Sequence, residues 1–228
     1  MKKKRIFFIF LFLVLASAYT VRVSYVNRDN TKTRIHYIED GSPAKTQNFE
    51  IRVEKKALYD VAAFVKEFPT ARTFYTYQGS IYEQMDDRDT LLGIKYVLYA
   101  EVVFKNITDE IQEVDTANYS LFMNESYHNG LNPFLIEELN QFSGLSLKPG
   151  HTYTVKFAFD LHEKNIDPAR YQDIASQDFS LALTGYPHIQ RLKLSDIPYI
   201  KTDAEADTLY QDLIAMTDAE RAARHHIA

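Results

Sequence analysis

The stretch from Leu145 to Leu161 constrains the fold more than any other part of the chain. Apolar and polar residues alternate along it, and a period of two is typical of a β-strand with one buried and one solvated face. The expected buried residues are Tyr153, Val155, Phe157, Phe159 and Leu161, and the expected solvated residues are Thr152, Thr154, Lys156, Ala158 and Asp160. Pro149 and Gly150 predict a turn before the strand, because proline presets φ and glycine accepts a positive φ.

Other segments extend this pattern into a β-sandwich. Residues 94–106 are apolar on both faces, which predicts a central strand whose second face meets helices. Apolar residues from Leu58 to Phe68 follow helical spacing, and Pro69 ends the pattern, so we expect a short helix over one end of the sandwich. Further strands are predicted at 33–38, 49–53, 119–123, 179–183 and 189–194, with a hairpin at 74–82.

Composition agrees with a β-protein and excludes several chemistries. The 228 residues include 16 Tyr and 15 Phe, which favour pleated, half-buried surfaces. The net charge is −5, and it becomes −5 − 4 = −9 without the four cationic residues at positions 2–5. Such an acidic surface repels a phosphate backbone, so we expect no nucleic-acid partner. The absence of cysteine excludes disulfides, thiolate catalysis and zinc–thiolate sites, and we expect no cofactor.

The N-terminus indicates export. A cationic cluster at positions 2–5 precedes an uncharged run from Ile6 to Val21. As a helix this run covers about 24 Å, slightly less than a ~30 Å hydrocarbon core. That length is typical of a signal peptide, and Ala16-Ser17-Ala18 is a small-residue cleavage pattern, although an anchor could also thin the bilayer locally. We therefore expect an exported protein, either secreted after cleavage behind Ala18 or anchored in the membrane through residues 6–21.

The chain divides into three parts. Residues 1–24 form the signal peptide or anchor, 30–198 the β-sandwich domain and 200–228 a helical tail. In the tail, Thr202 and Glu205 have the spacing of a capping box, as do Thr217 and Glu220. We expect the first tail helix to pack on the sandwich.

The segment 124–143 is the least regular part of the domain. Asn129-Gly130 predicts a turn, and Asn132 followed by Pro133 predicts the start of a short helix. We expect this segment to cover the end of the hydrophobic core, with partner recognition as the alternative. Its candidate partner-contact residues are Tyr127, Asn132 and Phe134.

Three residue groups were tested for chemistry. Asp86, Asp87 and Asp89 lack the spacing of an EF-hand, so we expect a solvated loop and no metal site. The seven histidines match no metalloprotease spacing, and no P-loop or nucleophile elbow occurs. Glu137 and Glu138 are the carboxylate pair considered for glycoside hydrolysis, but we expect them on a solvent face. The sequence therefore predicts no catalytic residue.

The run from Tyr96 to Leu161 resembles exported, immunoglobulin-like β-sandwich domains of unknown function from Gram-positive bacteria. The matching pieces are YVLYAEVVFKNITDE, TANYSLF, NGLNPFLIEELN and LKPGHTYTVKFAFDL, the last of which carries the L-x-P-G motif, and DFSLALTG resembles the closing strand. The resemblance implies a mainly β, immunoglobulin-like antiparallel β-sandwich with short accessory helices, placed behind an N-terminal signal or anchor. No catalytic residue comes with it.

We predict a non-catalytic extracytoplasmic module that binds or scaffolds protein at the cell surface, through a strand edge or through segment 124–143. A small cell-envelope hydrolase is the alternative from another class, and it would need a polar cleft with two carboxylates less than about 9.5 Å apart. An immunity-type or inhibitor protein is a further alternative, with specificity in the aromatics Tyr127 and Phe134. The sequence identifies no ligand.

Overall fold

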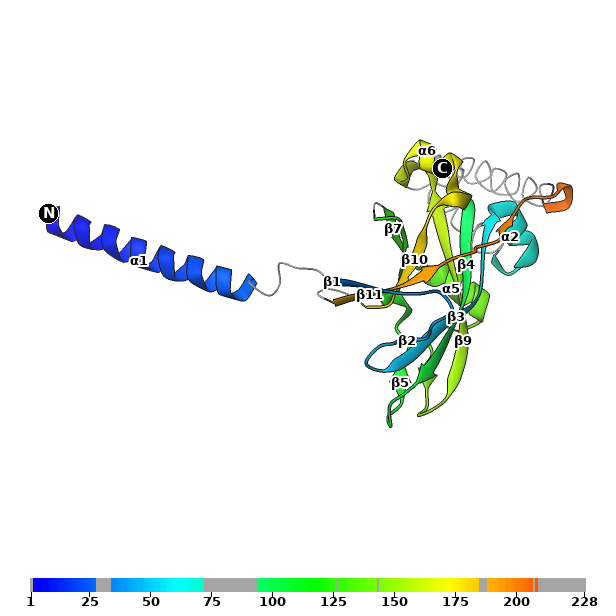
Figure 1. Cartoon of the computed structure of the whole chain (residues 1–228), viewed down its shortest axis with the longest axis horizontal. Helices are drawn as coiled ribbons and strands as arrows, with labels where there is room; N and C mark the ends of the chain where they lie inside the picture. The colour runs from blue at the N-terminus through cyan, green and yellow to red at the C-terminus, as the bar shows by residue number, and fades with distance from the viewer. Residues whose placement is uncertain are drawn as a thin grey trace, which may run out of the picture.

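The computed structural model of the chain describes residues 2–27, 34–71, 94–125, 127–142, 144–184, 188–206 and 208. Two β-sheets pack face to face, and short helices surround them (Figure 1). Sheet A has the strand order β1 (Arg34–Ile38), β11 (His188–Leu194), β10 (Phe179–Ala182), β6 (Ser120–Met123), β7 (Tyr127–Gly130). Sheet B has the order β12 (Tyr199–Ile200), β3 (Phe49–Asp60), β4 (Ile94–Asn106), β9 (Thr152–His162), and β2 (Ala44–Lys45) pairs with β3. A separate pair joins β5 (Gln112–Glu113) to β8 (Ser146–Leu147).

The predicted mainly β sandwich with short accessory helices is confirmed, with one difference in strand direction. Neighbouring strands are antiparallel except at two edges, where β1 runs parallel to β11 and β12 runs parallel to β3. A parallel pair needs a crossover connection between its strands. For β1 and β11 that connection is most of the domain, because nearly all other strands lie between them in the sequence.

The main core lies between the sheets and consists of their inward-facing apolar residues. Phe104 on β4 and Phe157 on β9 are fully buried, and Leu121 and Leu192 face them from sheet A. The ring of Tyr119 packs edge-on against Phe104, with centroids 5.3 Å apart. Each such fully buried side chain contributes about 1.5–3 kcal/mol through the hydrophobic effect.

Strand β4 is central and buried on both faces, as predicted. A second apolar cluster covers the outer face of sheet B, where Val97 and Tyr99 pack with residues of α2 (Val61–Glu67) and α5 (Pro133–Asn140). Ile94 belongs to this outer cluster, although strict alternation predicted it on the other face with Leu98. The register with β9 shifts after Ile94, and one extra residue moves a side chain to the opposite face of a sheet.

Strand β9 follows the predicted alternation with exceptions at both ends. Phe157 and its inward neighbours are buried, and Gly150 has the predicted positive φ of 72° in the preceding turn. Tyr153, predicted to be buried, is 41% exposed, and its ring lies at the edge of the core against Phe142. Ala158 and Asp160, predicted to be solvated, are buried. Ala158 packs in the outer cluster beneath α5, a cover that the strand's own sequence does not reveal.

The helix predicted from Leu58 begins at Val61. Leu58 still belongs to β3, where it pairs with Leu98, and α2 ends at Glu67, close to the predicted stop at Pro69. Strand propensity and helical spacing overlap over these residues, so the sequence placed the boundary one turn early.

The segment 124–143 forms a strand and a helix. The turn predicted at Asn129-Gly130 is wrong, because both residues belong to β7 and pair with β6. The predicted cap is confirmed: the Oδ1 atom of Asn132 accepts a hydrogen bond from the Phe134 amide, 3.1 Å away. Helix α5 lies against β9 on the outer face of sheet B, so it does not plug the sandwich end as predicted.

At the N-terminus, α1 (Lys2–Asn27) projects away from the sandwich (Figure 1). Within the described residues, no helix is both long enough and apolar enough to cross a bilayer. The signal peptide or anchor therefore stays a prediction.

At the C-terminal end, Oδ1 of Asp203 accepts a hydrogen bond from the Ala206 amide at 2.8 Å. Asp203 therefore caps the start of this helix, whereas the capping-box pattern predicted Thr202 as the cap. The predictions for the hairpin at 74–82, for the acidic cluster at 86–89 and for the second tail helix lie outside the described residues.

Candidate functional site

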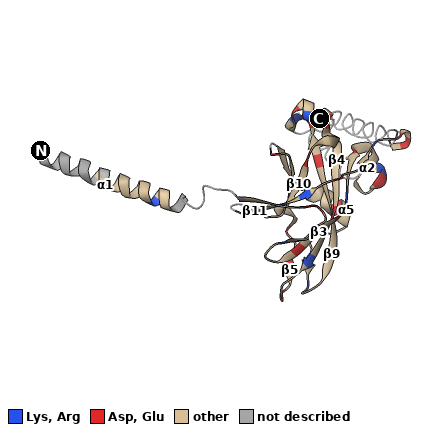
Figure 2. Cartoon of the chain, viewed as in Figure 1, with Lys and Arg blue, Asp and Glu red and all other residues tan. Residues whose placement is uncertain are grey.

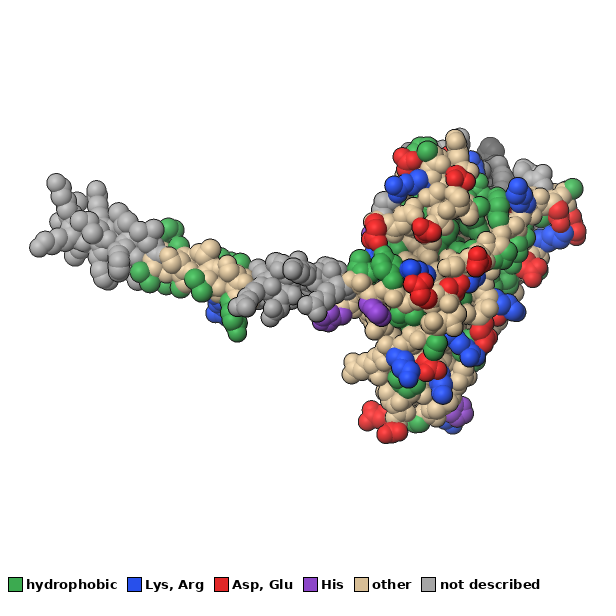
Figure 3. All heavy atoms as spheres, in the orientation of Figure 1, with side chains coloured by type: hydrophobic (Ala, Val, Ile, Leu, Met, Phe, Trp, Pro, Cys, Tyr) green, Lys and Arg blue, Asp and Glu red, His purple; other side chains and the backbone are tan. Residues whose placement is uncertain are grey.

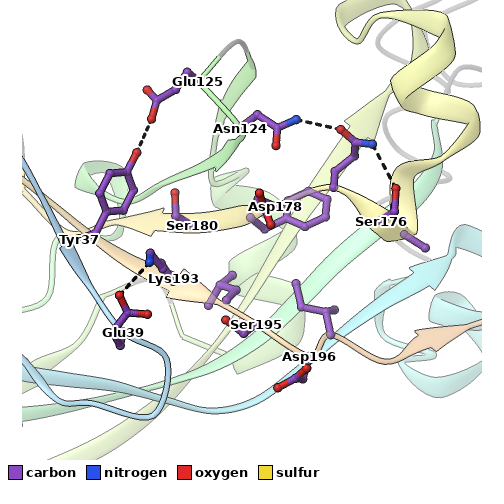
Figure 4. A pocket seen from close by; sticks show the side chains of 15 residues that line it. Tyr37, Glu39, Asn124, Glu125, Ser176, Asp178, Ser180, Lys193, Ser195 and Asp196 are labelled. Atoms are coloured by element: carbon purple, nitrogen blue, oxygen red, sulfur yellow. Dashed lines mark hydrogen bonds and ion pairs between the residues drawn. The ribbon is translucent and has the colours of Figure 1, made fainter.

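A recess of about 750 Å³ lies at one end of sheet A (Figure 4). Strands β1, β6 and β11 end at this recess and β10 begins there, so side chains from distant parts of the chain meet in it. Its polar lining comprises Tyr37, Glu39, Asn124, Glu125, Ser176, Gln177, Asp178, Ser180, Lys193, Ser195 and Asp196. Both signs of charge are present, as they are over the visible face of the body (Figure 3) and over the cartoon of the domain (Figure 2).

Strand alternation places cationic side chains on the outer face of sheet A. Leu192 and Leu194 of β11 point into the core, so Arg191 and Lys193 point outward. Tyr37 lies directly opposite Arg191 across the parallel β1–β11 pair. Strand β11 thus packs leucines into the core and presents cationic side chains on its other face.

Arg191 is the centre of this outer face and is only 4% exposed. Its Nη1 donates to Oε2 of Glu125 at 3.2 Å and to the Tyr37 hydroxyl at 3.4 Å. The guanidinium carbon lies 3.7 Å from the centre of the Phe122 ring, and that ring stacks on His128 on its neighbouring strand. Such cation–π contact fixes the plane of the guanidinium as well as stabilising its charge.

Two ion pairs set the protonation of the site. The Tyr37 hydroxyl donates to Glu125, and this hydrogen bond, together with the charge of Arg191, lowers the pKa of the Glu125 carboxyl. The same hydrogen bond raises the pKa of Tyr37. Lys193 Nζ donates to Glu39 at 2.8 Å, which raises the pKa of Lys193 (Figure 4). At neutral pH the Glu125 carboxylate is therefore ionised and Lys193 is charged.

The ionised Glu125 carboxylate does not fit the role of a general acid at neutral pH. A general acid at neutral pH needs a carboxyl group whose pKa is raised, whereas the pKa of Glu125 is lowered. Among the described residues, no group of three or more His, Asp and Glu side chains is placed to hold a metal ion. Glu137, from the pair considered for glycoside hydrolysis, is exposed on α5 and does not line the recess.

The three predicted contact residues do not line this recess. Tyr127 was predicted to be an exposed aromatic, but it is 6% exposed, and its hydroxyl donates to the Asp160 carbonyl at 3.4 Å. It reaches only the wall of a smaller hollow of about 460 Å³. Asn132 is occupied in capping α5, while Phe134 is 51% exposed. That exposure leaves Phe134 as a predicted contact.

Sequence reasoning missed Tyr37, Glu125 and Arg191. The sequence predicted a strand at 189–194, and the signal available for its polar face is the alternation of two cations with leucines in β11. Tyr37 and Arg191 are 154 positions apart, so no local pattern could join them.

A second hollow of about 520 Å³ lies beside α2 on the outer face of sheet B. Its wall combines Tyr59, Phe68 and Tyr99 with the carboxylate of Glu101. The Tyr99 hydroxyl and Lys55 Nζ both donate to Glu101, at 3.1 and 3.2 Å, and burial raises the pKa of Tyr99. The Phe68 and Tyr99 rings already contact each other, with centroids 4.6 Å apart. We therefore take the larger recess as the candidate site.

Fold and site together define a two-layered β-sandwich domain with a charged recess at one end of sheet A. The chain belongs to the family described as a domain of unknown function (DUF5028), whose sequence model matches residues 20–190. This agrees with the predicted resemblance to domains of unknown function. The L-x-P-G motif as a family feature and the N-terminal signal stay predictions.

Solved structures include similar chains from Gram-positive bacteria. An uncharacterised β-sandwich protein from Clostridium difficile is 10% identical, with 72% of this chain and 97% of that chain covered and a TM-score of 0.36. The yjhA protein from Bacillus subtilis is 15% identical, with coverages of 69% and 98% and a TM-score of 0.39. A candidate lipoprotein from Staphylococcus aureus is 9% identical, with coverages of 73% and 97% and a TM-score of 0.37. No curated protein matches the chain.

Proposed function

We propose that this protein is a non-catalytic binding module that acts outside the cytoplasmic membrane and holds a partner protein on the outer face of sheet A. The observation that carries the proposal is the buried Arg191, stacked on Phe122 and hydrogen-bonded to Tyr37 at the recess. Arginine and tyrosine are the residue types enriched at binding hot spots. A rigid sheet that fixes their positions lowers the entropy cost of binding.

Charge distribution supports binding over hydrolysis. The recess is lined by the Lys193–Glu39 pair and by Glu125, whose partner Arg191 lies beside it. Charges of both signs complement a polar partner surface and select against wrong partners. A glycoside hydrolase would need one carboxyl group with a raised pKa, and the pKa of Glu125 moves the other way.

Location outside the membrane is supported by the cationic cluster and apolar run at the N-terminus. If the segment remains in the membrane, only residues 28–33 separate α1 from β1, which carries Tyr37. Six residues span at most about 22 Å. The recess of an anchored protein would then face partners that are themselves close to the membrane.

Site-specific photo-crosslinking in intact cells tests the proposal. A photoreactive residue at Asp178, in the recess, is expected to capture a protein partner, and the same residue at Lys148, in the exposed turn before β9, is not. Equal capture at both positions, or none at Asp178, would contradict the proposed surface. Fractionation of the same cells checks the location, and a protein found wholly in the cytosol would contradict export.

A further inference from the structure

Arg191 is a buried cation whose hydrogen bonding is incomplete. Among the described residues, the charged side chains that are buried are Asp160 and Arg191. The Nε atom of Arg191 is buried and has no hydrogen-bond partner. Its Nη1 reaches Glu125 through a single oxygen at 3.2 Å. Guanidinium groups in buried ion pairs commonly bind an oxyanion through two parallel N–H donors, and this pair lacks that geometry.

Glu125 is a weakly held partner for Arg191. Its side chain is 67% exposed, whereas that of Arg191 is 5% exposed. It lies directly after β6, at the rim of the recess, with one oxygen toward Tyr37 and the other toward Arg191. An exposed carboxylate gains little from an ion pair, because water solvates it equally well. Little free energy therefore opposes its exchange for another oxyanion.

We propose that Arg191 is an oxyanion-binding residue and that Glu125 is an internal carboxylate which a carboxylate or phosphate group of the partner displaces. The incoming oxyanion takes the Nη1 donor and the Tyr37 hydroxyl that Glu125 now occupies. This inference rests on the proposed function, since it names the chemistry of the partner group that enters the same surface.

The surroundings of Arg191 are arranged for such an exchange. The guanidinium carbon lies 3.7 Å from the centre of the Phe122 ring, and this contact does not involve Glu125. Lys193 Nζ lies 5.8 Å from the Tyr37 ring centre, so a second positive charge stands over the Tyr37 ring. Its own partner, Glu39, is an exposed carboxylate on the same rim. Both cations would therefore attract an incoming anion.

The test uses the purified full-length protein and two probes, inorganic phosphate and succinate, in calorimetric titrations at constant ionic strength. Glu125→Gln removes the competing charge and keeps the side-chain shape, so we expect it to bind a probe about tenfold more tightly than the wild type. Glu54→Gln is the matched control, because Glu54 forms an exposed pair with Arg52 at 2.6 Å on β3. The control is expected to bind like the wild type.

A second variant leaves the buried Arg191 in place and removes the Tyr37 donor. Tyr37→Phe retains the ring and removes one donor, and in the Glu125→Gln background it is expected to weaken probe binding about fivefold. The Nε–H resonance of Arg191 in nuclear magnetic resonance spectra is expected to shift on titration. Binding of phosphate alone assigns a phosphate-bearing partner, and binding of succinate alone assigns a carboxylate. No binding of either probe, or equal binding with and without Glu125, overturns the inference, whereas crosslinking at Asp178 tests the surface separately.

Discussion

Replacing Asn106 with alanine is expected to destabilise the sandwich strongly, because its side chain makes four hydrogen bonds in a fully buried position. Nδ2 donates to the carbonyls of Glu110 and Leu147, at 2.7 and 2.8 Å. Oδ1 accepts from the amide and the hydroxyl of Thr108, both at 2.9 Å. One amide side chain thus connects β4 to the turn after it and to β8.

The expected loss follows from which groups lose their partners. Each of the four hydrogen bonds is worth about 1 kcal/mol, including the buried one to the Leu147 carbonyl. The sum is roughly 4 kcal/mol, a large part of the ~5–15 kcal/mol that stabilises a typical domain. With an m-value of about 2 kcal/mol/M, the urea midpoint should fall by about 2 M.

Urea unfolding followed by circular dichroism measures this effect. Asn118→Ala is the matched control, since Asn118 is exposed and hydrogen-bonds only to the neighbouring Asp115 in the described contacts. Its cost should stay within about 0.5 kcal/mol. An Asn106→Ala loss below about 1 kcal/mol, or equal losses for both variants, would refute the hydrogen-bond reasoning.

Three further predictions concern pH, a strand edge and helix packing. Burial raises the pKa of Tyr127 to about 12, so the folded state favours the neutral phenol. The contribution of Tyr127 to the free energy of unfolding should be complete below about pH 10 and should fall as the pH rises toward 12. Tyr127→Phe should remove a contribution of about 2–3 kcal/mol from this alkaline loss, and unchanged alkaline unfolding would show that other groups cause it. The Asn140 side chain hydrogen-bonds to the backbone amide and carbonyl of Lys156, at 2.8 and 2.9 Å, and so covers the free edge of β9. Asn140→Ala should therefore speed hydrogen exchange of the Lys156 amide and promote association of two molecules through this edge. A variant that stays monomeric with unchanged exchange would contradict this role of Asn140. Leu135→Ala should cost about 2–5 kcal/mol and Phe134→Ala less than about 0.5, because the first is fully buried and the second is half-exposed; similar midpoints in thermal unfolding would contradict the packing of α5.

Local features of the sequence predicted local structure well. The alternation in β9, the apolar run of β4 and the turn at Gly150 depend on neighbours within a few positions, and each was predicted. The cap at Asn132 is local too, since its oxygen reaches an amide two residues ahead. Such features are fixed by backbone sterics and by short-range hydrogen bonding, which the sequence contains directly.

Tertiary structure decided which surfaces are covered and which side chains meet. Ala158 is buried because α5 lies over it, and Tyr127 is buried within the sandwich rather than presented to a partner. A period of two assigns residues to opposite faces of a strand, but it does not say whether a helix covers the polar face. The candidate site depends still more on the fold, because Tyr37 meets Arg191 only after β1 pairs with β11 across 154 positions. The sequence by itself determined the long strands and most of their inward faces, and only the assembly of the strands into sheet A brought a buried cation, an aromatic ring and an exposed carboxylate together beside one recess.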